Sequence, residues 1–122
     1  MTALQILRSG GDFSRYASPV SLGSRVPEEE WLAAFHSVQR AAVILREHGA
    51  GRVMLFGSLA RKEDFEPHSD IDLAVWGIPD KAFFAVGARV MDLDSLHEIN
   101  IIDGAKVPER IGTRIEEEGV SL

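Results

Sequence analysis

The chain has 122 residues, no cysteine and a formal net charge of −6. This length supports one domain with a single core that needs no disulfides. No apolar stretch approaches the ~20 residues of a membrane helix, and the absence of cysteine fits a reducing compartment, so we expect a cytoplasmic protein without membrane contact. The acidic charge argues against direct nucleic-acid binding, because a nucleic-acid backbone is bound by a basic stripe.

The chain begins with a segment unlike the rest. Residues 1–26 combine glycine and serine with scattered apolar positions, which predicts a loosely structured arm with a short strand at 4–7. A single domain is then predicted over residues 27–122. Its first helix starts at Pro27, because proline suits the first helical turn and the three glutamates that follow suit the positive end of the helix dipole. Gly49 ends that helix as a C-cap.

A buried strand is predicted next, because the apolar run 53–56 stops at Gly57 and so reads as a strand entering a tight turn. Residues 58–61 are expected to open a short helix whose backbone N–H groups face an incoming anion. The remaining predicted elements are a strand at 70–75, a helix at 80–93, a strand at 98–102, a helix at 108–117 and a short strand at 120–122. This order predicts an α/β (α+β) fold with a small mixed β-sheet flanked by helices.

Two carboxylates stand out on the second strand. Asp70 and Asp72 are two positions apart, so in an extended chain they share a face and lie about 6.6 Å apart. Paired oxygen ligands suit Mg²⁺, which prefers a few carboxylates together with substrate phosphates. The alternative is that both are solvated acids at a strand edge or turn. With the Gly57-Ser58 turn upstream, the pattern favours a site for a nucleoside triphosphate.

The two motifs, Gly-Ser followed after two residues by Arg61 and Ser-Asp-x-Asp at residues 69–72, resemble nucleotidyltransferases of the DNA polymerase beta superfamily. They are most similar to the stand-alone minimal nucleotidyltransferases (MNT), the MntA-like antitoxins of HEPN/MNT pairs. The resemblance covers roughly residues 50–122. It implies the nucleotidyltransferase fold, with a compact sheet and helices on one side.

The resemblance also implies roles for the motif residues. Asp70 and Asp72 would hold two Mg²⁺ ions that bridge the triphosphate of ATP, the substrate. Gly57 would let the backbone approach closely, and Ser58 would bond the β- or γ-phosphate, although the pair also fits an ordinary turn with a serine cap. Arg61 would pair with the triphosphate, and a plain surface arginine is the alternative.

The third strand departs from the pattern of these relatives. They carry a third carboxylate there, which accepts the proton of the attacking hydroxyl, and the aligned position here is Asn100. An amide cannot act as a general base at neutral pH. Glu98 shares the face of Asn100 and is the local candidate for compensation, with a solvated strand-start acid as the alternative. The predicted catalytic set is therefore Asp70, Asp72, Glu98 and Asn100.

The function expected from the resemblance is Mg²⁺-dependent transfer of a nucleoside monophosphate, AMP from ATP, to a hydroxyl acceptor. The implied acceptor is a HEPN-type helical partner protein in a toxin–antitoxin pair. The alternative is a catalytically degenerate module that neutralises its partner by protein contact, and a more distant one is modification of a small molecule. The oligomeric state is left open, with a homo-oligomer among the alternatives.

Overall fold

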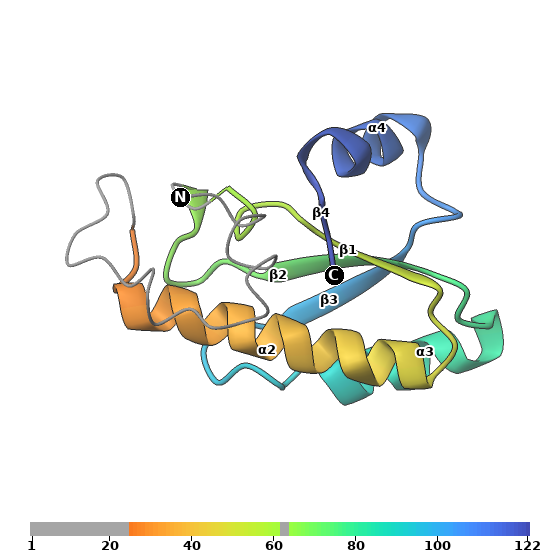
Figure 1. Ribbon diagram of the computed structural model, residues 1–122, viewed down its shortest axis with the longest axis horizontal. Helices are drawn as coiled ribbons and strands as arrows, with labels where there is room; N and C mark the ends of the chain where they lie inside the picture. The colour runs from red at the N-terminus through yellow and green to blue at the C-terminus, as the bar shows by residue number, and fades with distance from the viewer. Residues whose placement is uncertain (1–24, 62–63) are drawn as a thin grey trace.

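The computed structural model describes residues 25–61 and 64–122, so the arm predicted over 1–26, with its strand at 4–7, falls almost entirely outside the described residues. Within the described residues, helices α2, α3 and α4 surround one sheet (Figure 1). In chain order the elements are α2 (Glu28–Glu47), β1 (Arg52–Phe56), β2 (Ile71–Trp76), α3 (Asp80–Val90), β3 (Ile99–Asp103), α4 (Glu109–Glu118) and β4 (Val120–Ser121). None of the helices in this part of the chain is long and apolar enough to span a membrane.

The four strands form one mixed sheet in the order β3-β2-β1-β4. β1 runs antiparallel to both β2 and β4, whereas β2 and β3 are parallel. Parallel neighbours require a crossover connection, and α3 supplies it between β2 and β3. The predicted mixed sheet flanked by helices is therefore confirmed.

The larger part of the core lies between the sheet and the helices α2 and α3. On this face β1 and β2 present alternate residues, among them Leu55 and Leu73, which are completely buried. In α2, Trp31 and Phe35 are one turn apart, and their rings meet edge to face with centroids 4.7 Å apart. This packing anchors α2 across the strands that carry the candidate site.

The opposite face of the sheet is covered by α4, so the expectation of helices on one side is wrong (Figure 1). Ile115 of α4 is buried against Met54 of β1 and Ala74 of β2. The physical reason is visible in the strands, whose central residues are apolar on both faces. A sheet of this kind needs cover on each side. The position of α4 matters because Asp72 lies on the face that α4 covers.

The short helix expected at 58–61 is also absent. The segment forms one turn, in which the Arg61 N–H group approaches the carbonyl oxygens of Gly57 at 3.3 Å and of Ser58 at 3.1 Å. Leu59 and Phe65, on either side of this turn's end, are both completely buried. The chain must therefore return to the core within a few residues, which leaves no room for a longer helix.

Candidate active site

The register of the β1–β2 ladder brings the two sequence motifs together. Phe56, the last residue of β1, pairs with Asp72 near the start of β2, so Gly57 follows directly beside the Asp72 side chain. A Cβ atom on Gly57 would lie 2.8 Å from Oδ2 of Asp72. Gly57 also has a φ of 81°, in the left-handed region that side chains disfavour. The glycine is therefore required twice, by its own backbone and by the carboxylate.

The two carboxylates interact with each other. Asp72 is half-buried and Asp70 is exposed. Burial raises the pKa of Asp72, and the neighbouring negative charge of Asp70 raises it further. A cation would relieve both effects, and the donor set of two hard carboxylate oxygens fits Mg²⁺, which completes its shell with phosphate and water oxygens. The residues present therefore fit the metal that the motif implies.

A cavity of about 470 Å³ opens over this pair. The structure places five of the predicted site residues around it and adds others from β1, from the loop before β2 and from α4. Its lining consists of Phe56, Gly57, Ser58, Arg61, Ser69, Asp70, Asp72, Ile111 and Arg114. The volume lies in the range of small-molecule and cofactor sites.

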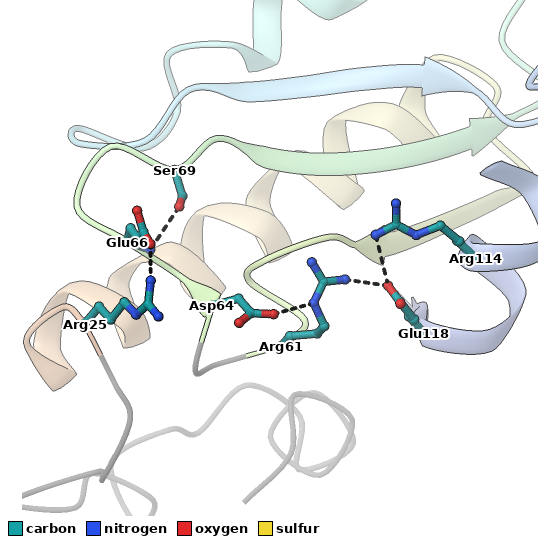
Figure 2. Close-up of polar contacts among 7 residues, drawn as sticks. All are labelled: Arg25, Arg61, Asp64, Glu66, Ser69, Arg114 and Glu118. Carbon is teal, nitrogen blue, oxygen red and sulfur yellow. Dashed lines mark hydrogen bonds and ion pairs between the residues drawn. The ribbon is translucent and has the colours of Figure 1, made fainter. Parts of the chain in front are cut away.

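Two arginines line the cavity from different elements, and each lies beside an acidic group (Figure 2). The Arg61 guanidinium donates to Asp64 at 2.7 Å and to Glu118 of α4 at 2.5 Å. Arg114 lies 3.9 Å from the same Glu118 carboxylate. The hydrogen bond to Asp64 raises the pKa of Arg61 against the opposing effect of burial. Glu118 therefore links a positive charge of the motif turn to one of α4.

Arg114 and Glu118 were missed by sequence reasoning. The available signal was the pattern of α4, in which Ile111 and Ile115 face the sheet and residues three or four positions away flank them. Using that signal requires knowing that α4 covers the face that carries Asp72.

The third-strand candidates are placed differently. In the parallel ladder Asn100 pairs with Asp72, so strand alternation puts an amide on the same face as the carboxylates. Glu98 is exposed and precedes β3. Neither Glu98 nor Asn100 is among the residues that line the cavity over Asp70 and Asp72. Within residues 25–61 and 64–122, no group of three or more His, Cys, Asp or Glu side chains is placed to hold a metal ion. In this structure, therefore, Glu98 does not complete a three-carboxylate cluster.

A second, apolar cavity of about 180 Å³ lies between α3 and the edge strand β3. Phe83, Phe84 and Met91 are among its lining residues, together with Asn100. Phe84 is 88% exposed, the highest value among the exposed large apolar side chains of the described residues. The two cavities thus differ in chemistry, one charged and one apolar.

The family model described as "Polymerase beta, Nucleotidyltransferase" matches residues 40–122. That range includes both motifs, the whole sheet and α4. Among curated proteins, none matches the chain in sequence.

Solved structures share the fold. A chain of the toxin–antitoxin complex MntA–HpeT is 19% identical, with a TM-score of 0.58 over 70% of each chain. An assembly of a tri-AMPylated HEPN toxin with an MNT antitoxin from Shewanella oneidensis contains a chain that is 18% identical, with a TM-score of 0.54 over 70% of this chain and 68% of that one. A protein described as a minimal nucleotidyltransferase is 27% identical, with a TM-score of 0.52 over 70% of this chain and 91% of its own.

The close approach at Gly57 leads to a first prediction. Gly57→Ala should reduce the free energy of unfolding by about 1–3 kcal/mol, because the new methyl group meets Asp72 and the backbone φ is strained. Urea unfolding followed by circular dichroism measures the difference. Gly51→Ala is the matched control, since nothing lies within 4 Å of a Cβ atom there. Equal stability of the two variants would contradict the geometry.

The raised pKa of Asp72 leads to a second prediction. A carboxyl group whose pKa is raised by folding binds its proton more tightly in the folded state, so its ionisation destabilises the fold above that pKa. In the presence of EDTA at pH 7, Asp72→Asn should therefore raise Tm by a few degrees. The difference should shrink as the pH falls through the range in which carboxyl groups titrate. Thermal scans across that range measure it, with the exposed Asp92→Asn as control; a constant or reversed difference would refute the assignment.

Proposed function

Because the chain belongs to the polymerase beta nucleotidyltransferase family, we propose that it transfers AMP from ATP to a hydroxyl group of a HEPN-type partner protein. In this reaction the acceptor oxygen forms a bond to the α-phosphorus, the bond from that phosphorus to the bridging oxygen breaks, and pyrophosphate leaves. The acceptor hydroxyl loses its proton. We assign the reaction to the domain over residues 27–122.

One observation carries the proposal: the Gly57-Ser58 turn and both aspartates line a single cavity of suitable size. Asp70 and Asp72 would hold Mg²⁺ there. The ions, two of them by analogy with the family, would neutralise phosphate charge and stabilise the in-line displacement. The Ser58 hydroxyl and the backbone beside Gly57 would hold the terminal phosphates, because no side chain at Gly57 blocks their approach.

Two arginines would also bind the triphosphate. Arg61 and Arg114 line the cavity from the motif turn and from α4, and guanidinium groups bind phosphate oxygens in a planar, two-point geometry. Glu118 and Asp64 keep Arg61 oriented toward the site. The anionic ligand would compete with Glu118 for the same guanidinium groups, so binding would rearrange this network.

The partner is proposed from the structural neighbours. One neighbour comes from the toxin–antitoxin complex MntA–HpeT, and another from a complex of an MNT antitoxin with a HEPN toxin described as tri-AMPylated. On this chain, the exposed Phe84 and the apolar cavity beside it offer a surface that a protein could cover. We propose that the same partner both binds the chain and receives the nucleotide.

Asn100 favours a second candidate, a degenerate module that acts by contact alone. The amide pairs with Asp72 in the ladder, at the place where the family pattern has its third carboxylate, and it cannot take the acceptor proton. Under the catalytic proposal that proton must leave to water or to a group of the partner. Under the contact proposal no proton moves, and the apolar cavity is the functional surface.

Label transfer separates the two candidates. Purified chain is incubated with Mg²⁺, α-phosphate-labelled ATP and the protein encoded by its neighbouring gene. The catalytic proposal expects label on that protein, and a reduction of about a hundredfold or more for Asp72→Asn because metal stabilisation of the transition state is lost. A stable complex of the two proteins without label would favour contact alone.

Restoring the missing carboxylate is a further test. Asn100→Asp should raise the rate of transfer by about a hundredfold, the usual contribution of a general base. The double variant Asp72→Asn with Asn100→Asp serves as control and should stay inactive, which excludes a contaminating activity. An unchanged rate in Asn100→Asp would show that deprotonation of the acceptor does not limit the reaction.

A further inference from the structure

The residues on either side of Asp70 are each hydrogen-bonded to the segment 97–98. The carbonyl oxygen of Ser69, just before it, lies 2.7 Å from Nδ1 of His97. The N–H group of Ile71, just after it, donates to the carbonyl oxygen of Glu98 at 2.8 Å. A carbonyl oxygen can only accept, so Nδ1 of His97 carries the proton. The direction in which Asp70 leaves the chain therefore depends on residues 97–98.

His97 is itself held rigidly. Its side chain is completely buried, and Nε2 lies 2.7 Å from Oε2 of Glu30 in α2. The ring packs against Phe65 with centroids 4.3 Å apart, and its backbone N–H donates to Asp94 at 2.9 Å. The imidazole thus joins α2, the loop before β2 and the loop before β3.

Ser69 is tied by its other polar groups as well. Its N–H donates to the carbonyl oxygen of Glu66 at 3.0 Å. Its Oγ accepts from the Glu66 N–H at 2.9 Å, as Figure 2 shows. These two bonds close the loop on itself and reach no residue outside it. Phe65 anchors the start of the loop in the core, and the bond from His97 fixes its end at Ser69, directly before Asp70.

We propose that His97 is a positioning residue that fixes the orientation of the Asp70 carboxylate, and that Glu30 holds the imidazole in place. This role rests on the metal site proposed above. A buried imidazole with both nitrogens bonded is costly unless each partner is in place, and an apolar side chain would pack against Phe65 without that requirement. Groups that orient metal ligands typically change metal affinity by about 10- to 100-fold when they are removed.

Two substitutions divide the contacts of His97. In His97→Asn the amide nitrogen takes the place of Nδ1, so the bond to Ser69 is kept and the contact with Glu30 is lost. In His97→Gln the amide nitrogen takes the place of Nε2, so the contact with Glu30 is kept and the bond to Ser69 is lost. Both variants should lower Tm. The measured quantity is the affinity for the Mn²⁺ complex of α,β-methylene ATP, by calorimetry well below either Tm.

The proposal expects His97→Gln to bind this complex about tenfold more weakly than wild type. His97→Asn, which keeps the bond to Ser69 but loses the contact with Glu30, should lose affinity by a clearly smaller factor. Equal affinities in the two variants, whether reduced together or unchanged, would overturn it in favour of a packing role. Phe65→Leu is the packing control, expected to lower Tm without changing affinity. Wild type must first bind more tightly than Asp72→Asn; if it does not, the proposed function itself fails.

A milder pair keeps the test decisive if His97→Gln does not fold. Glu30→Gln retains an amide group that can bond to Nε2 and should bind as wild type does. Glu30→Ala keeps the imidazole but releases its far nitrogen, so the affinity should fall by a smaller factor than in His97→Gln. Wild-type affinity in Glu30→Ala would overturn the role proposed for Glu30.

Discussion

The antiparallel register of β1 against β2 is the constraint on which the site depends. It sets Gly57 against Asp72, residues that are far apart in the sequence, and leaves room between them only because glycine has no Cβ. A shift by one residue would turn Asp72 toward the face covered by α2 and α3, among completely buried apolar side chains. The core on both faces therefore protects the register, and the register makes the cavity.

The electrostatics of the cavity follow from this placement. Asp72 is half-buried beside another carboxylate, and its raised pKa records the cost. The arginines nearby do not offset that charge directly, since Arg61 already pairs with Asp64 and Glu118. A triphosphate arriving alone would meet two carboxylates and arginines that are already engaged. A triphosphate arriving with divalent cations brings the charge that the aspartates lack, so metal and nucleotide binding are expected to be coupled.

The sequence predicted the strands and the motif because both depend on short-range patterns. Apolar runs ending at Gly57 and the alternation around Asp72 need no tertiary knowledge, and the structure brings these residues together. Three features needed that knowledge. The turn after β1 is limited by the return of the chain to the core, α4 covers the second face, and Arg114 reaches the cavity only from there. No local pattern states which face a helix will cover.

The edge strand β3 carries two features that point in opposite directions. Asn100 lacks the basicity that transfer chemistry would use, whereas the segment just before β3 orients the chain on both sides of Asp70. A module acting only by contact has no evident need for a buried imidazole bonded to the loop that carries an aspartate. The bond from His97 to Ser69 has a clear use if the Asp70 side chain must meet a ligand in a fixed orientation. The contacts around Asp70 therefore favour metal and nucleotide binding. Under that interpretation, the amide at Asn100 means that another group must take the proton of the acceptor.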